Sequence, residues 1–240
     1  HALALVQPRA RVVIVSTGSE LVEPGQPLAP GQISDVNGVM LEACIRNMGA
    51  SAQRWPSIGD DAGLLARTLQ EAAAEFDLVL TTGGVSMGAY DTVKQVLTEL
   101  GAAHFEKVAM QPGMPQGHGR IGARGTPIIT LPGNPVSAFV STQVFVRPVL
   151  GRLHGQVDAG VAPAHAVSAE PFASPAGKVQ YVRARLTQDS PPLAHPTGVQ
   201  GSHILGGLAE ADCLLVVPAQ VQQVERGDEL EMLDLRQESR

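Results

Sequence analysis

Short apolar runs alternate with longer amphipathic segments along the first 150 residues. Arg11–Ser16 (RVVIVS) and Asp77–Thr82 (DLVLTT) have the length and the apolar composition of buried strands, and both run into glycine-containing turns. In Asp35–Met48 the apolar residues recur with a period near 3.6, and Gly49 ends the pattern, which predicts a helix. The chain therefore begins with a strand, a helix and a further buried strand.

The same alternation continues to residue 150. It predicts strands at Ser51–Ser57 and Pro127–Leu131, and helices from Asp60-Asp61 to Ala74, from Asp91 to Leu100 and over Pro135–Leu150. The Pro/Gly-rich stretch Gln111–Gly119 is expected to be a loop. Strands that alternate with helices predict an α/β fold, a three-layer open and mostly parallel sheet with helices on both faces.

The pattern of apolar and polar residues changes after Gly151. Short alternating runs at Val179–Leu186, Leu214–Val217 and Glu229–Leu233 are separated by turns rich in Pro, Gly and Asp, with one short helical candidate at His203–Ala209. This pattern predicts a small all-β, barrel-like domain. We expect an α/β domain over residues 1–150 and a β domain over residues 151–240.

Composition narrows the functional classes. The 17 basic and 23 acidic residues give a net charge of −6 without a block of like charges, so we expect no nucleic-acid partner. No apolar run approaches the roughly 18 residues of a membrane span, and the start has no signal-peptide pattern, so we expect no membrane partner and a cytoplasmic location. Cys44 and Cys213 lie in apolar stretches, where neither a disulfide nor a metal site is expected, and the histidines lack the paired spacing of zinc ligands.

Candidate chemistry lies where strands end, because ligands of open parallel sheets bind beyond the carboxyl ends of the strands. Three loops stand out there: Thr17–Glu20, Gly83–Asp91 (GGVSMGAYD) and Leu131–Ser137 (LPGNPVS). In the second, glycine backbone N–H groups and the Ser86 hydroxyl would suit a phosphate. A tight turn between strand and helix is the alternative interpretation of that loop.

In the third loop Asn134 is expected to be the N-cap of a helix, with Pro135 at its first position. The N–H groups near Val136 and Ser137 would then point toward a bound anion. A well-started helix without an anion is the alternative interpretation, and the motif taken alone favours it.

Three carboxylates fall at the same presumed edge of the sheet, those of Glu20, Asp35 and Asp91. Carboxylates that face phosphate-binding loops commonly hold Mg²⁺. For each residue alone, a solvated helix cap is the alternative.

Four motifs in order carry a family resemblance: TGSELVEPGQ (Thr17–Gln26), GGVSMGAYD (Gly83–Asp91), MQPGMPQG (Met110–Gly117) and LPGNPVSA (Leu131–Ala138). Together they resemble the molybdopterin-binding domain of the MoeA and gephyrin E-domain family. TGVQGS (Thr197–Ser202) is similar to part of that family's small C-terminal β domain, so the resemblance spans nearly the whole chain.

The resemblance implies a molybdopterin molybdenumtransferase. Such an enzyme binds adenylylated molybdopterin and molybdate, cleaves the adenylate with a divalent ion such as Mg²⁺, releases AMP and inserts molybdenum into the pterin dithiolene. It implies catalytic roles for Asp91, Glu20 and Asp35, with Asp91 and Glu20 holding the metal. The implied ligand-binding residues are Thr17, Gly18, Gly83, Gly84, Ser86, Gly88, Pro115, Pro132, Gly133, Asn134, Ser137, Arg183 and Ser202.

The resemblance also implies partners. It predicts a homodimer in which Arg183 and Ser202 of the β domain face the cleft of the partner subunit, and a molybdopterin adenylyltransferase as a possible further partner. Relatives carry domains upstream of this region that the sequence does not match, so the 240 residues alone are expected to bind ligand without turning it over.

The chain departs from the family at one motif. Many relatives have Lys-Pro-Gly-Lys-Pro where this chain has Gln111-Pro112-Gly113-Met114-Pro115, so two cations that would attract molybdate are replaced. Two other functions stay open. They are a molybdopterin adenylyltransferase, which shares the GGVS-type domain but has no β domain after it, and a non-catalytic scaffold of the gephyrin type.

Overall fold

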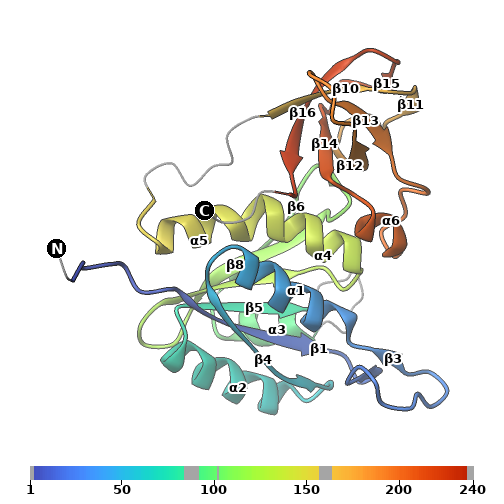
Figure 1. Ribbon diagram of the computed structural model, residues 1–240. Coiled ribbons are helices and arrows are strands. Elements are labelled where there is room, and N and C mark those ends of the chain that lie inside the picture. Colours follow the sequence, from blue (N-terminus) through green and yellow to red (C-terminus); the bar gives the residue numbers. More distant parts are fainter. Residues whose placement is uncertain (1–2, 84–91, 102, 157–163, 237–240) are drawn as a thin grey trace.

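The chain folds into two parts, each built around its own sheet (Figure 1). The computed structural model describes residues 3–83, 92–101, 103–156 and 164–236. A six-stranded sheet forms the first part, and a second sheet formed mainly by residues 164–234 lies above one end of it in Figure 1. The chain therefore has the α/β plus β architecture expected from its sequence pattern.

The first sheet has the strand order β4-β1-β5-β9-β8-β6. Its strands are β1 (Arg11–Thr17), β4 (Ser51–Ile58), β5 (Leu78–Thr82), β6 (Ala103–Lys107), β8 (Pro115–Ile121) and β9 (Thr126–Leu131). The first four strands of that order run parallel, β8 runs antiparallel to β9, and β6 runs antiparallel to β8. The sheet is open and mostly parallel, which confirms the prediction.

Helices cover both faces of this sheet. The helices are α1 (Val36–Asn47), α2 (Ala62–Glu75), α3 (Thr92–Glu99), α4 (Pro135–Ser141), the π-helix η1 (Thr142–Val146) and α5 (Arg147–Leu153). Buried residues of α1, α4, η1 and α5 form one apolar cluster with the sheet, and those of α2 and α3 form another on the opposite face. Parallel strands buried on both faces explain the nearly continuous apolar runs of β1 and β5.

The aspartates at the starts of the first two helices correctly predicted where these helices begin. The Asp35 carboxylate accepts the Gly38 N–H at 2.9 Å at the start of α1, and the Asp61 carboxylate accepts the Leu64 N–H at 2.8 Å at the start of α2. Both side chains satisfy N–H groups that have no partner inside the helix. A polar residue before an apolar period was therefore a sound start signal here.

The helix expected over Pro135–Leu150 is interrupted. The π-helix η1 lies in its middle, where the Arg147 N–H donates to the Thr142 carbonyl five residues back. Pro148 follows directly, and proline lacks an N–H and crowds the carbonyl four residues before it. The wider π turn accommodates that proline, and the helical segment continues to Leu153.

The expectation of a loop over Gln111–Gly119 is wrong for most of its length. Pro115–Ile121 is strand β8, and Met110–Gln111 is the short strand β7. The turn-like glycines have a packing role, because a Cβ on Gly117 would collide with the Thr130 hydroxyl and with the Phe105 ring at 2.8 Å.

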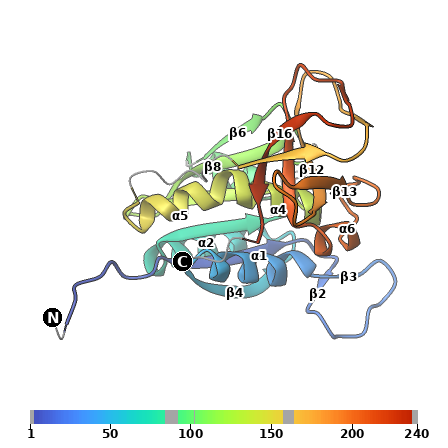
Figure 2. The ribbon, with the colours of Figure 1, turned by 45° about the horizontal axis from the view of Figure 1, so that its top comes forward.

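The second sheet closes on itself. Its strands are β10 (Ala164–Ser168), β12 (Val179–Leu186), β13 (Leu193–Pro196), β14 (Cys213–Val217) and β16 (Glu229–Asp234). They pair in the order β13-β10-β16-β14-β12, and β12 pairs again with β13, so five strands form a closed barrel around an apolar core (Figure 2). This confirms the expected barrel-like domain.

Smaller elements complete the described chain. They are the pairs β2 (Leu21–Val22) with β3 (Ile33–Ser34) and β11 (Phe172–Ala173) with β15 (Gln223–Val224), and the short helix α6 (Gly206–Ala209). The β2–β3 pair belongs to an arm that projects from the α/β part in Figure 2.

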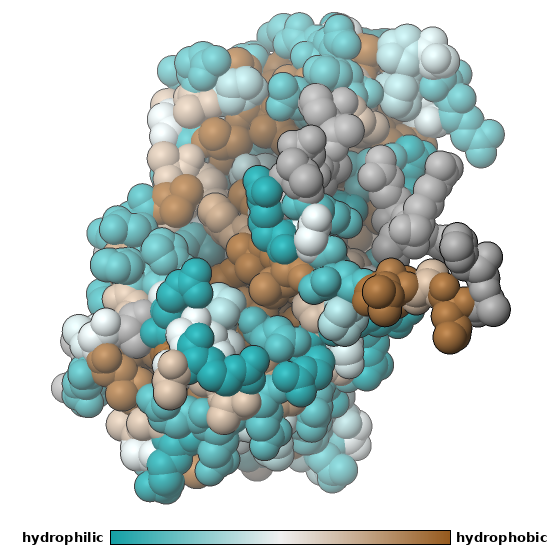
Figure 3. Space-filling model, turned by 90° about the vertical axis from the view of Figure 1, so that its left-hand side faces the viewer, coloured by the Kyte–Doolittle hydropathy of each residue, from teal (hydrophilic) through white to brown (hydrophobic). Residues whose placement is uncertain are grey.

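The two parts are joined by more than the connecting chain. Strand β7 pairs with β12 of the barrel, so a piece of the first part extends the second sheet. Buried Met110, Val136, Val140 and Leu214 form an apolar cluster across this junction. Figure 3 shows hydrophobic surface gathered at mid-height on one face, between the upper and lower parts.

The domain boundary that the sequence places between residues 150 and 151 stays a prediction. No helix in the described part of the chain is long and apolar enough to cross a membrane.

Candidate functional site

The candidate site lies at the carboxyl end of β5. From β1 and β9, on either side, the chain continues into α1 and α4 on one face of the sheet, whereas α3, the helix after β5, covers the opposite face. Adjacent connections that leave on opposite faces open a crevice at the strand ends, which is where ligands of such sheets bind. The predicted loops after β1, β5 and β9 all begin at this crevice.

Glycines let these loops approach one another closely. Gly83, at a φ of +90°, lies directly against the Thr17 carbonyl, where a Cβ would collide with it. A Cβ on Gly133 would stand 3.5 Å from the Gly83 Cα. The structure therefore brings Thr17, Gly83 and Gly133 together as predicted, and backbone atoms make the closest approaches at their junction.

Asn37 fastens the same junction, and the sequence reasoning did not single it out. It lies in the first turn of α1 and is 8% exposed. Its Nδ2 donates to the Thr82 hydroxyl at 2.9 Å and to the Gly133 carbonyl at 2.8 Å, while its Oδ1 is buried without a partner. The one available signal was a polar residue on the stripe that continues with buried Leu41 and Ile45.

The predicted carboxylates occupy different environments. Glu20 is exposed, and its carboxylate lies over the Gly18 Cα, where a Cβ would stand 2.6 Å from an oxygen. Asp35 is 4% exposed, and one of its oxygens caps α1. Nearby Asp60 accepts the Ser19 hydroxyl at 2.6 Å. Of these two carboxylates, Glu20 is the more accessible to a metal ion. Asp35 is a helix cap, but a buried one rather than the solvated cap of the alternative interpretation.

The start of α4 is covered from within the same chain. Asn134 is the N-cap and Pro135 the first helical residue, as predicted, but the Asn134 side chain makes no capping bond. Its Nδ2 donates instead to the Ser202 hydroxyl at 3.1 Å, and the Val136 N–H donates to the Ser202 carbonyl at 3.0 Å. Ser202, expected to face a partner subunit, contacts its own chain here.

The loop that departs from the family motif lies at the same edge. Gly113 packs on α4, its carbonyl accepts the Gln116 amide at 2.6 Å, and that amide also reaches the Ser141 hydroxyl at 2.6 Å. Met114 is exposed. Pro115 pairs with Lys107 at the end of β6, so the edge carries an exposed lysine that the sequence reasoning did not single out.

Arg183 is placed differently from the expectation that it faces a cleft. It is 1% exposed in β12, and its guanidinium donates to acceptors in residues 199–204 of the same domain. Burial lowers the pKa of this guanidinium from its ordinary value.

The remaining predicted site residues are either buried beside the crevice or lie outside the described residues. Pro132 and Ser137 are buried beside the crevice. Gly84, Ser86, Gly88 and Asp91 lie outside the described residues. Within the described ranges no three His, Cys, Asp or Glu side chains are grouped so that they could hold a metal ion.

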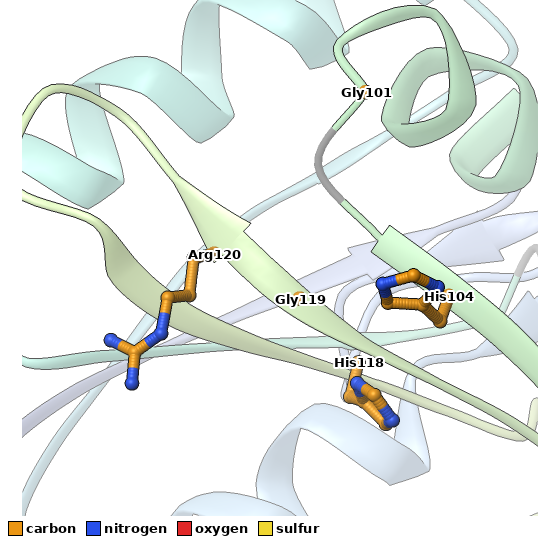
Figure 4. Close-up of a pocket in the computed structure, with 5 residues that line it drawn as sticks. All are labelled: Gly101, His104, His118, Gly119 and Arg120. Carbon is orange, nitrogen blue, oxygen red and sulfur yellow. The ribbon is translucent and has the colours of Figure 1, made fainter.

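A separate pocket of about 390 Å³ lies on the outer edge of the sheet and is lined by Gly101, His104, His118, Gly119 and Arg120 (Figure 4). His104 and His118 are paired across β6 and β8, with ring centroids 5.7 Å apart. The Arg120 side chain points away from both rings and donates to the Gly125 carbonyl. Arg120 pairs with Pro127 near the start of β9, so this pocket lies toward the opposite end of the sheet from the crevice.

Comparison with known families matches both parts of the chain. Residues 13–152 match the family described as a probable molybdopterin binding domain, and residues 165–235 match the MoeA C-terminal region, its domain IV.

Individual relatives cover the same span. The chain is 45% identical over 236 residues to molybdopterin molybdenumtransferase 2 of Mycobacterium tuberculosis, covering 96% of this chain and 58% of that protein. It is 30% identical to a molybdopterin molybdenumtransferase of Haemophilus influenzae, covering 91% of this chain and 54% of that protein. A crystal structure of the molybdopterin biosynthesis MoeA protein from Pyrococcus horikosii superposes with a TM-score of 0.81 at 30% identity, covering 95% of this chain and 55% of that one. The chain thus spans little more than half the length of these relatives.

Proposed function

The chain belongs to the family of probable molybdopterin-binding domains, and we propose that it forms the C-terminal half of a molybdopterin molybdenumtransferase. The proposed reaction binds adenylylated molybdopterin and molybdate, cleaves the adenylate to release AMP, and transfers molybdenum to the dithiolene. The relatives named as molybdenumtransferases support this activity, and the chain matches them over more than nine-tenths of its length.

The observation that carries the proposal is the junction of Thr17, Gly83 and Gly133 at the end of β5. Three loops meet there through backbone atoms, and the Asn37 amide ties two of them together. Glycine-rich backbone at strand ends can approach a pyrophosphate or a pterin ring without interference from Cβ atoms. We propose that the ligand lies over this junction, beside the predicted loop residues Gly84, Ser86 and Gly88.

The carboxylates of Glu20 and Asp91 are proposed to bind a magnesium ion. Mg²⁺ takes one or two protein carboxylates and keeps several waters, so Glu20 with Asp91 would be a sufficient protein contribution. The Glu20 carboxylate over Gly18 has no side-chain hydrogen bond among the described residues, and it fits this role. When bound, the ion would neutralise charge on the phosphate groups. Asp35, whose oxygen caps α1, is proposed to act by holding Asn37 and the start of that helix in place.

The oxyanion part of the site is proposed to lie near Pro115. Gln111 can donate a hydrogen bond to molybdate, whereas Met114 cannot. Lys107 pairs with Pro115 and supplies a cation at this edge. We propose that Lys107 and backbone amides provide the attraction for molybdate that the two missing lysines would otherwise add.

A homodimer, a molybdopterin adenylyltransferase that supplies the adenylylated substrate, and a cytoplasmic location belong to the same proposal. The support for the dimer is the family resemblance alone, because in this structure Ser202 contacts its own chain. Cys44 and Cys213 are both free thiols, which suits a reducing compartment. The adenylyltransferase alternative is disfavoured because residues 165–235 match the MoeA C-terminal region.

The direct test is release of AMP from adenylylated molybdopterin by the full-length protein. We expect release that depends on both molybdate and Mg²⁺. Release without molybdate dependence, together with adenylylation of molybdopterin from ATP, would favour the adenylyltransferase instead. Light scattering at high protein concentration that gives only a monomer would exclude the dimer.

A further inference from the structure

Two histidines that are distant in sequence lie next to each other on the outer edge of the first sheet (Figure 4). His104 of β6 and His118 of β8 occupy directly opposite positions of an antiparallel pair, so their side chains project from the same face of the sheet. Their ring centroids are 5.7 Å apart, and the ring planes are inclined by 52°. The register of the two strands creates this pair, so spacing along the sequence does not reveal it.

Both rings are accessible to a ligand. On the other side of β8, His118 pairs with Ile129, which belongs to the apolar cluster under the helices, yet both histidines are exposed. Neither imidazole makes a hydrogen bond within the described residues. Each neutral ring therefore keeps a nitrogen lone pair for a ligand. The pocket of about 390 Å³ beside the rings is lined further by Gly101 and Gly119, which have no side chains to fill it.

The spacing of the rings suits a shared metal ion. Neutral imidazole is a ligand for Zn²⁺, Cu²⁺ and Ni²⁺. Two imidazoles bound to one tetrahedral zinc, with Zn–N distances of about 2.0–2.1 Å, have ring centroids about 5 Å apart. Since both side chains are exposed, a small rotation takes them from 5.7 Å to that spacing. The inclination of the ring planes excludes a parallel stack, in which an ion could not lie between the rings.

The direction of Arg120 favours a cation over an anion as the ligand. An arginine beside two histidines would suit an anion if all three side chains converged. The Arg120 side chain instead points away from both rings, and its guanidinium donates to the Gly125 carbonyl at 3.0 Å. The fixed positive charge of this pocket is thus directed away from the two imidazoles.

We propose that His104 and His118 form a two-histidine site for a late divalent transition-metal ion such as Zn²⁺. The described residues provide no third His, Cys, Asp or Glu for this site, so water molecules complete the coordination. Structural zinc sites use four protein ligands, so an ion held by two links β6 to β8 and exchanges with solvent. Neither histidine belongs to the three loops at the crevice, and the proposal is independent of the proposed function.

The first test is calorimetric titration of the full chain with ZnCl₂, in an excess of Mg²⁺ that occupies sites made of carboxylates. The variants are His104→Gln, His118→Gln and the double variant. We expect one zinc ion per wild-type chain, an affinity lower by roughly tenfold or more in each single variant, and no further loss in the double variant, because one ion needs both rings. If each single variant instead loses half of the bound zinc, the two imidazoles act independently and the proposal is wrong. Wild-type affinity no greater than that of the variants would also overturn it.

His195 provides the matched control, because it is an exposed histidine on a strand but pairs with Arg185 rather than with another histidine. His195→Gln should leave the zinc affinity unchanged. All the substituted side chains are exposed, so every variant should melt at the wild-type temperature without zinc. Zinc should raise the melting temperature of the wild type and of His195→Gln only. An equal rise in His104→Gln and His118→Gln would contradict a shared ion.

Inorganic phosphate is the probe for the competing anion site. The imidazole resonances of His104 and His118 are followed by NMR during separate titrations with ZnCl₂ and with phosphate. We expect zinc to shift both resonances at the same stoichiometry and phosphate to leave them in place. Phosphate-dependent shifts of both resonances that disappear in Arg120→Gln, without any shift by zinc, would identify an anion site and overturn the proposal.

Discussion

Replacing Asn37 with alanine should loosen the junction beneath the proposed ligand site. The side chain joins α1 to the ends of β5 and β9, through the Thr82 hydroxyl and the Gly133 carbonyl. After truncation the Thr82 hydroxyl still donates to the Pro132 carbonyl at 3.2 Å, but the Gly133 carbonyl loses the Asn37 amide. The strands themselves keep their ladder bonds, so the fold should persist.

The magnitude follows from the two hydrogen bonds that Asn37 makes. At about 0.5–1.5 kcal/mol each, their loss should lower the free energy of unfolding by about 1–3 kcal/mol. For a protein of this size 1 kcal/mol corresponds to roughly 2–4 °C, so the melting temperature should fall by about 2–12 °C. Molybdopterin binding should weaken together with stability, because Gly133 would no longer be held against Gly83.

Urea denaturation and thermal melting measure this effect, with Asn47→Ala as the control. Asn47 is the same residue type at the other end of α1 and is exposed. It makes no side-chain hydrogen bond within the described residues, so its substitution should change stability by less than about 0.5 kcal/mol. Equal unfolding midpoints for the Asn37 and Asn47 variants would refute the role assigned to the Asn37 amide.

Three further predictions test other parts of the molecule. Asp91→Ala in the full-length protein should abolish AMP release with an unchanged circular dichroism spectrum, and unchanged activity would remove this residue from the site. Gln111→Lys with Met114→Lys should tighten molybdate binding roughly ten-fold or more, with a gain that shrinks in salt if the site is exposed; equal affinities by calorimetry would exclude this loop. Burial raises the pKa of Asp77, but hydrogen bonds from Arg11 outweigh it and hold the pKa below its ordinary value. The stability that Asp77 contributes is present above about pH 4 and is lost as the pH falls through the folded-state pKa. Asp77→Asn should therefore reduce the dependence of the urea unfolding midpoint on acid pH. An equal pH dependence in the wild type and the variant would contradict this.

The sequence by itself determined most of the helices and strands, and it predicted the edge of the sheet at which ligands would bind. Strand β12 spans Val179–Leu186 as predicted, and α1 lies between Asp35 and Met48 as predicted. These features depend on residues two to four positions apart, so periodicity and capping signals are sufficient to locate them. The close approach of Thr17 and Gly83 was likewise predictable, because turns at the ends of parallel strands meet at one edge.

The composition of neighbouring residues gave a wrong prediction where packing between distant segments determines the secondary structure. Gln111–Gly119 has the composition of a loop, yet Gly117 lies in strand β8, at a position where Thr130 and Phe105 leave no room for a side chain. A glycine that permits a turn and a glycine that permits close packing are identical in sequence. Only the neighbouring strands distinguish them.

The tertiary structure alone decided which residues support the site. Asn37 reaches partners 45 and 96 positions away, and Ser202 reaches Asn134 over 68 positions. Arg183 has the residue type of an anion-binding side chain, yet the closed barrel encloses it and directs its donors to the carbonyls of residues 199–204. Whether a guanidinium meets a ligand or a backbone depends on strand order and on what covers it, and neither is encoded in the residues adjacent to it in sequence.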